Sequence, residues 1–214
     1  MYCNNNNHDE YLLFIIHFGR IKMELKDAIL KRRSVRKFTD HQVTEDEVNE
    51  LLDAARWAPS WANTQVWEFI VVRDKDIIQK IVSTYTENNP ATKCSLAASL
   101  LIVGCAKTGI SGTKKGADES SFSEWFMFDL GLAVQNLCLR AHDIGLGTVI
   151  VGSLDHASCK KHLSVPDGTE VIVVIPVGKP AVPDKQGPPR KNISDFTHIN
   201  VFGNAYKETS KNIF

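Results

Sequence analysis

Apolar residues recur at helical spacing along three stretches of the chain. The first predicts a helix from Met23 to about Arg33, and the second predicts one over residues 48–55 that ends near Pro59. The sequence T-E-D-E at residues 44–47 fits a capping box, in which the Thr hydroxyl and the last Glu satisfy free backbone N–H groups. Residues 122–144 form the longest periodic stretch and are apolar around most of their circumference. We therefore expect that helix to lie both in the core and in a subunit interface.

Short apolar runs rich in β-branched residues predict the strands, which lie over residues 69–72, 100–105, 148–152 and 170–177. Shorter helices are expected over residues 74–85 and 155–163, and turns over residues 86–93. The stretch 108–121 is rich in Gly, Ser and Lys and is predicted to be a mobile surface loop. The Pro-rich tail after Gly178 is expected to run extended over a surface. Because strands and helices follow no strict β-α-β-α order, we expect an α+β fold.

Residues 1–22 differ from the rest and are expected to be an extension that precedes one domain of residues 23–214. An Asn-rich start is followed by an apolar run at residues 11–18, far shorter than the roughly 20 residues that span a bilayer. The run also lacks the flanking features of a secretory signal. Our hypothesis is that Met23 is the natural start and that the extension is non-native. The alternative is an arm that packs on a partner subunit.

Charge and cysteine content narrow the classes of function. Lys plus Arg and Asp plus Glu number 25 each, so neither nucleic acid nor a membrane surface is expected as a main partner. The 5 cysteines show no C-x-x-C spacing, which indicates reduced thiols in a cytoplasmic protein. The 7 histidines are scattered, and we expect no metal site.

The stretch from Ala58 to Phe69 combines Pro59 and several short polar side chains with Trp61 and Trp67. A loop of this composition, held between a helix and a strand, suits a planar ligand with polar edges. The alternative is a loop anchored in the core whose polar residues only cap neighbouring elements.

Residues 31–37 hold 5 cations. A helix end that runs into an extended segment can direct Arg32, Ser34 and Arg36 to one side, where they suit a phosphate. The alternative is a solvated basic face that stabilises the helix C-terminus. The glycines at positions 145, 147 and 152 lack the G-x-G-x-x-G spacing and precede a strand, so a Rossmann site is disfavoured.

Four motifs follow one another along the chain. They are R-R-S-V-R-K-F at residues 32–38, A-P-S…N-x-Q-x-W-x-F at residues 58–69, D-x-G-x-A-x-Q-N-x-x-L at residues 129–139, and V-G-K-P at residues 177–180 with Arg190-Lys191. In this order and spacing the sequence resembles the FMN-dependent nitroreductase family. Two positions depart from the family pattern: Val66 replaces a proline, and Pro188-Pro189 replace a basic residue ahead of the terminal arginine.

The resemblance implies an intertwined homodimer whose mixed central sheet is flanked by helices, with two FMN sites at the interface. The family's basic flavin-binding run matches Arg32, Arg33, Ser34 and Arg36, and its C-terminal phosphate contact matches Arg190. The loop that reaches the flavin from the other subunit matches Pro59, Ser60, Asn63 and Gln65. The backbone that lines the flavin ring matches Ile150, Val151 and Gly152. NADH or NADPH would reduce the flavin, and a nitroaromatic, quinone or similar flat acceptor would then enter the same pocket in a ping-pong mechanism. No catalytic side chain is required. The alternative is a flavin-binding redox sensor or carrier with little turnover.

Overall fold

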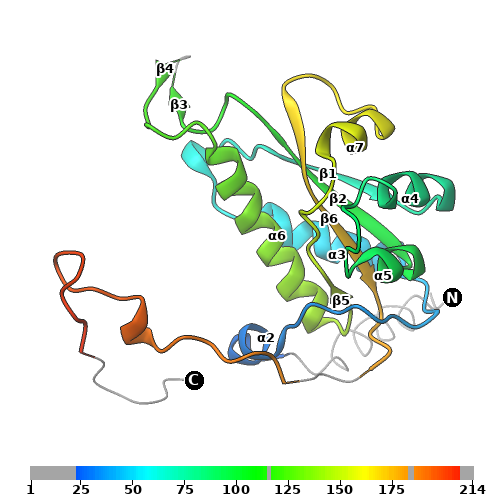
Figure 1. Ribbon diagram of the computed structural model, residues 1–214, viewed down its shortest axis with the longest axis horizontal. Helices are drawn as coiled ribbons and strands as arrows, with labels where there is room; N and C mark the ends of the chain where they lie inside the picture. The colour runs from blue at the N-terminus through cyan, green and yellow to red at the C-terminus, as the bar shows by residue number, and fades with distance from the viewer. Residues whose placement is uncertain (1–22, 115–116, 183–185, 208–214) are drawn as a thin grey trace, which may run out of the picture.

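The computed structural model describes residues 23–114, 117–182 and 186–207, and the expected extension at residues 1–22 lies outside them. Helices pack on both faces of a four-stranded sheet, and the tail runs out from this body past α2 (Leu25–Lys31) (Figure 1). No helix within the described residues is both long and apolar enough to cross a membrane. The domain boundary at residue 23 and the cytoplasmic location stay predictions.

The sheet has the strand order β1 (Trp67–Val72), β2 (Leu100–Lys107), β6 (Thr169–Gly178) and β5 (Gly147–Thr148). Its three strand pairs are all antiparallel, and with the surrounding helices they confirm the α+β class. Among the described residues, the mixed character expected of the sheet is limited to one isolated parallel bridge between Ser34 and Thr148.

Strand β5 is shorter than the strand predicted over residues 148–152, and the reason lies in its neighbour β6. Thr148 pairs with Val177, and the next pairing is an isolated bridge between Val151 and Val174. In this register Val149 lies opposite Pro176, and a proline has no N–H group to donate. The prediction of one continuous strand over residues 148–152 is therefore wrong.

Alternate residues of β2 serve two hydrophobic cores on opposite faces of the sheet. Leu100 and Ile102 belong to the core formed with α3 (Glu45–Arg56) and α6 (Trp125–Asp143). Leu101 and Val103 belong to the core formed with α4 (Lys75–Val82), α5 (Thr92–Ala97) and α7 (His156–His162). Burial on both faces explains why the sequence of β2 is a continuous apolar run.

The capping box predicted at the start of α3 is confirmed. Glu47 N–H donates to Thr44 Oγ1 at 3.2 Å, and Thr44 N–H donates to Glu47 Oε2 at 2.8 Å. Two N–H groups without helical partners are thereby satisfied, which fixes where α3 begins.

The long predicted helix is α6, and its two faces differ. Leu130 and Leu137 are fully buried in the core, whereas Phe128, Gly131 and Gln135 are exposed on the opposite face. A Cβ built on Gly131 would meet no atom within 4 Å. The exposed face is therefore open to a second molecule along much of the helix.

Two other predictions need correction. Helix α5 begins at Thr92, inside the stretch predicted to form turns, because a six-residue helix is too short to show a clear period. The stretch 108–121 is not a surface loop throughout: Ser111 and Gly112 are buried. A short hairpin of β3 (Thr113–Lys114) and β4 (Ala117–Asp118) follows them.

Candidate functional site

The basic segment at residues 32–36 lies beside residues 148–152. Val35 N–H donates to the carbonyl oxygen of Thr148 at 2.9 Å, next to the Ser34–Thr148 bridge. Gly147 permits this close approach, since a Cβ built on it would lie 2.6 Å from Cγ2 of Val35. The fold thus joins two groups of predicted cofactor residues that are far apart in the sequence.

Within residues 150–152 the side chains alternate between core and surface. Val151 is 3% exposed, and it exchanges two backbone hydrogen bonds with Val174, each at 2.9 Å. Ile150 is 45% exposed, and a Cβ built on Gly152 would meet nothing within 4 Å. The open side of this segment is therefore formed by Ile150 and Gly152, while the Val151 side chain faces the core.

The arginines of the candidate site form no ion pair with a carboxylate within the described residues; they are Arg32, Arg33, Arg36 and Arg190. Arg33 Nη1 donates to the carbonyl oxygens of Leu30 at 2.6 Å and Arg32 at 2.7 Å, so this guanidinium caps the end of α2. To the part of the chain that the structure describes, Arg36 makes only one hydrogen bond, a long one of 3.4 Å to the carbonyl oxygen of Ser34. Arg32 and Arg36 are consequently the cations with most capacity left for an anion.

The tail returns to the basic segment at Gly187. A Cβ built on Gly187 would lie 2.5 Å from Nε of Arg33, so the tail backbone passes directly against this side chain. That Nε atom is buried and has no hydrogen-bond partner among the residues that the structure describes. Arg190 follows three residues later and donates to the carbonyl oxygen of Pro188 at 2.9 Å. The structure thus places the tail backbone at Gly187 against Arg33, and Arg190 follows three residues further along the chain.

The loop after α3 holds an unusual backbone conformation. Ala62, Asn63 and Gln65 all have positive φ, at 44°, 57° and 48°, which costs roughly 1 kcal/mol for each non-glycine residue. Gln65 N–H donates to Ser60 Oγ at 2.9 Å, and Gln65 Nε2 donates to Asn63 Oδ1 at 3.2 Å. Val66, which replaces the family's proline, is fully buried. Internal hydrogen bonds and a buried anchor hold the loop in the absence of that proline.

Three of the four predicted loop residues line one groove. Its volume is about 580 Å³, and it is formed by Arg56, Trp57, Ala58, Pro59, Asn63 and Gln65. Trp57 is 75% exposed, with the guanidinium carbon of Arg56 5.6 Å from its ring centroid. The groove therefore offers an aromatic face and two side-chain amides to a ligand, while Arg56 is already paired with Asp53 at 2.6 Å.

Within one chain, the loop and the basic segment lie at opposite ends of α6 (Figure 1). Trp61 N–H donates to Asp129 near the start of this helix, whereas Thr148, which holds the basic segment, follows its end. The helix has 19 residues, which corresponds to about 27 Å at 1.5 Å per residue. The structure accordingly does not bring these two groups of predicted residues together in a single subunit.

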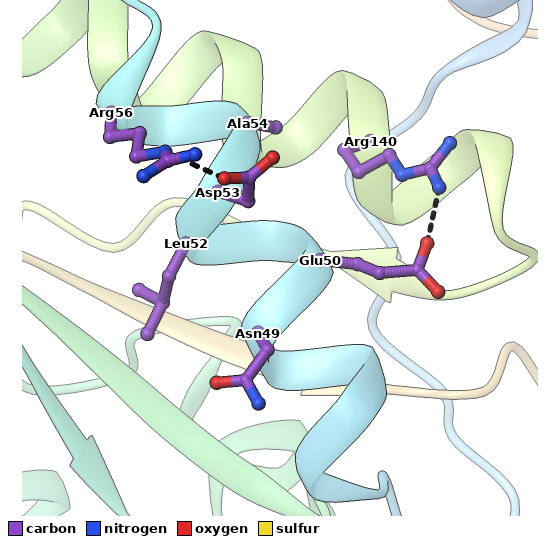
Figure 2. A pocket seen from close by; sticks show the side chains of 7 residues that line it. All are labelled: Asn49, Glu50, Leu52, Asp53, Ala54, Arg56 and Arg140. Carbon is purple, nitrogen blue, oxygen red and sulfur yellow. Dashed lines mark hydrogen bonds and ion pairs between the residues drawn. The ribbon is translucent and has the colours of Figure 1, made fainter.

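A larger groove, of about 770 Å³, lies between α3 and α6 (Figure 2). Its charged side chains pair with one another: Arg140 with Glu50, and Arg56 with Asp53 at 2.6 Å. None of the predicted cofactor residues lines it. Because its charges are already compensated, this groove is the weaker candidate for an anionic ligand.

The buried thiols are unsuited to nucleophilic chemistry. Burial raises the pKa of Cys138, although the charge of Arg32 partly opposes the shift. Burial likewise raises the pKa of Cys94, against the charge of Arg36, and that of Cys105 to about 12. These cysteines are protonated at neutral pH, and the thiol is a poor nucleophile.

Asp129 and Ser111 were not among the predicted site residues. Asp129 is 1% exposed and accepts hydrogen bonds from Trp61 N–H, at 3.1 and 3.2 Å to its two oxygens, and from Ser111 Oγ at 2.6 Å. The sequence held two signals for Asp129, since it opens the motif at residues 129–139 and shares a helix face with the apolar Ala133 and Leu137. Ser111 gave no signal, because nothing local distinguishes it from other serines in its segment.

Comparisons with known proteins give the class to which this fold and site belong. The model of the Nitroreductase family matches residues 29–179. The chain is therefore a member of the Nitroreductase family, as the sequence motifs predicted.

A relative from Methanothermobacter thermautotrophicus, named for NADH dehydrogenase and NAD(P)H nitroreductase activity, is 30% identical over 198 residues, which cover 90% of this chain and 95% of the relative. Among solved structures, the NADPH:FMN oxidoreductase of Vibrio harveyi in complex with NAD+ is similar with a TM-score of 0.70 and 25% identity, covering 86% of this chain and 79% of that one. An FMN-dependent nitroreductase of Clostridium difficile gives a TM-score of 0.68 at 25% identity, covering 83% and 100%.

Proposed function

We propose that the protein is an FMN-dependent NAD(P)H oxidoreductase that reduces nitroaromatics, quinones or similar flat acceptors. The observation that carries the proposal is a set of guanidinium groups that, among the described residues, have no carboxylate partners and lie beside the open surface at Ile150 and Gly152. Family membership and relatives named for FMN reductase and NADPH-flavin oxidoreductase activities point to the same cofactor.

The residues present fit a flavin mononucleotide. Arg32, Arg36 and the Ser34 hydroxyl offer charge and donors to a phosphate, and Arg190 follows three residues after Gly187, which packs against Arg33. Within the described part of the chain the buried Arg33 Nε finds no hydrogen-bond partner, so this donor is available to an acceptor on a ligand. Bound there, FMN would accept a hydride from NADH or NADPH and pass electrons to a second substrate. The chain's own residues bind and orient the cofactor.

A homodimer would complete the site. Because the loop and the basic segment lie at opposite ends of α6, a two-fold axis across the middle of this helix would bring one subunit's loop to its partner's basic segment. The exposed face of α6 around Gly131 permits close contact there, since no side chain keeps a second helix away. Exposed apolar side chains in the tail support an intertwined arrangement; they include Phe196, Ile199, Val201 and Phe202.

The acceptor side of the proposed site is aromatic. Trp61 packs on Trp125, with ring centroids 5.0 Å apart, and Trp125 packs edge-on against Phe128 at 5.5 Å. Phe128 is 59% exposed, so this cluster, placed beside the predicted cofactor loop, presents an apolar ring at the surface. Flat acceptors such as quinones and nitroaromatics match a surface of this kind.

The test uses the full-length protein and its colour. We expect the purified protein to be yellow, to bleach when NADH or NADPH is added under nitrogen, and to regain its colour when a quinone or nitroaromatic is added, with repeated turnover. Bleaching with negligible turnover on every acceptor would favour a redox sensor or carrier instead. A colourless protein that binds no added FMN would rule out both.

A further inference from the structure

We propose that Asp129 is a positioning residue that couples the predicted cofactor loop to the segment that follows β2. The inference rests on the proposed function, because it assigns a role toward FMN. Asp129 lies on α6, is 1% exposed and is hydrogen-bonded to both segments.

The first contact joins Asp129 to the loop. Trp61 N–H donates to both carboxylate oxygens, at 3.1 and 3.2 Å. Trp61 immediately precedes Ala62 and Asn63, whose positive φ values make the loop conformation costly on its own. A hydrogen bond from a backbone N–H to a carboxylate is charge-assisted and stronger than a neutral one. Asp129 therefore ties the strained part of the loop to a rigid helix.

The second contact joins the same carboxylate to the segment after β2. Ser111 Oγ donates to Asp129 Oδ2 at 2.6 Å, and Ser111 is 2% exposed. The backbone of Gly112 packs directly against the Trp125 ring: a Cβ built on this glycine would be 2.7 Å from Cδ1 of Trp125. Trp125 in turn contacts Trp61. One carboxylate and one indole thus connect both segments.

The charge of Asp129 makes these contacts mutually dependent. Within the described residues no cation pairs with it, so its stability in the interior depends on the Trp61 and Ser111 donors. Removing either donor leaves the carboxylate less satisfied and loosens its hold on the other segment. A substitution at Ser111 should therefore increase the mobility of Asn63 and Gln65. Among the described residues, no hydrogen bond joins residues 108–112 to either of them.

The experiment compares Ser111→Ala, Asp129→Asn and the double variant with wild type. Asp129→Asn is nearly isosteric: its carbonyl can still accept from Trp61 N–H, and the Ser111 hydroxyl can rotate to accept from the new amide. Ser99→Ala is the matched control, because Ser99 is also a buried serine with one side-chain hydrogen bond. Its Oγ accepts from Val43 N–H at 2.8 Å, whereas Ser111 Oγ donates to Asp129. Ser99 precedes β2, at the end opposite Ser111.

Two measurements are made on the full-length protein as purified. Release of FMN on dilution, followed by the rise in flavin fluorescence, should be about fivefold to tenfold faster in Ser111→Ala and in Asp129→Asn. The double variant should show less than the product of the two effects. Hydrogen exchange measured by mass spectrometry should accelerate over residues 58–65, as well as over 108–112, in Ser111→Ala. Ser99→Ala should change neither, even if it lowers thermal stability as much.

The proposal is overturned if Ser111→Ala accelerates exchange over residues 108–112 alone and releases FMN at the wild-type rate. It is also overturned if the two single effects multiply in the double variant. A wild-type protein that binds no FMN would refute the proposed function instead, and the exchange over residues 58–65 would still decide whether Asp129 couples the two segments.

Discussion

Replacing Gly147 by Ala should separate the basic segment from β5 with little other change. The new Cβ would lie 2.6, 2.7 and 2.9 Å from Cγ2, Cβ and Cγ1 of Val35. Carbon atoms pack best at about 3.5–4.0 Å, so Val35 must move by roughly 1 Å. The backbone at Gly147 does not have positive φ, so Ala meets no conformational penalty of its own there.

The expected cost follows from the contacts that would be disturbed. Overpacking of this kind costs about 1–3 kcal/mol. The hydrogen bond from Val35 N–H to the Thr148 carbonyl, now 2.9 Å, contributes about 1 kcal/mol more if it breaks. We therefore expect a loss of about 2–4 kcal/mol in the free energy of unfolding. FMN retention should fall at least tenfold, because Arg32 and Arg36 move with Val35.

Urea unfolding and the ratio of flavin to protein absorbance after gel filtration measure the two effects. The reciprocal variant Val35→Gly/Gly147→Ala removes the obstructing atoms and should recover most of the FMN retention, with Val35→Gly alone as the reference for added backbone flexibility. If Gly147→Ala retained wild-type FMN and lost less than about 0.5 kcal/mol, the contact between these segments would not support the site.

Four further changes test separate parts of the structure. Arg32→Ala should weaken FMN binding by about 1.5–3 kcal/mol through loss of a charge-assisted phosphate contact, and unchanged flavin retention on gel filtration would count against that assignment. Thr44→Ala removes the α3 capping box and should cost about 1 kcal/mol in urea unfolding while leaving flavin retention intact. Burial raises the pKa of Cys105 from 9.0 to about 12, so its contribution to stability is complete below pH 9 and is lost as pH rises toward 12. Cys105→Ala should therefore flatten the fall in unfolding free energy between about pH 9 and pH 10.5, by up to about 1.4 kcal/mol per pH unit, and an unchanged slope would contradict the shift. Gly131→Lys should leave the fold of each subunit intact, since a Cβ there meets no atom within 4 Å, but should convert the proposed dimer to monomers in light scattering; a variant that stays dimeric would place the interface elsewhere.

The sequence predicted those elements whose signals are local. The capping box and period of α3, and the long period of α6, depend on residues within a few turns of each other. The end of β5 depends instead on Pro176 in another strand, and its effect appears only once the register is known. The composition of the basic segment and of the Ala58–Phe69 loop suited a ligand but left a purely structural alternative open, and the resemblance to the family predicted both as parts of a site.

The support for that site was less predictable. The loop conformation depends on Asp129, 68 residues away in the chain, and on positive φ at Ala62, Asn63 and Gln65. No glycine marks these positions, and only Asn63 is of a residue type that adopts the left-handed conformation readily, so the sequence gives little sign of it there. Tertiary hydrogen bonds hold residues in conformations that their local sequence disfavours.

The placement of the loop and the basic segment at opposite ends of α6 has a genetic consequence. In the proposed dimer each site draws its loop from one gene product and its arginines from the other. A subunit defective in the loop and a subunit defective at Arg32 are each inactive alone, yet a mixed dimer contains one site built from two intact halves. Random pairing of equal amounts would restore about a quarter of the sites. An allele that is defective in the loop and an allele that is defective at Arg32 should therefore complement each other in one cell.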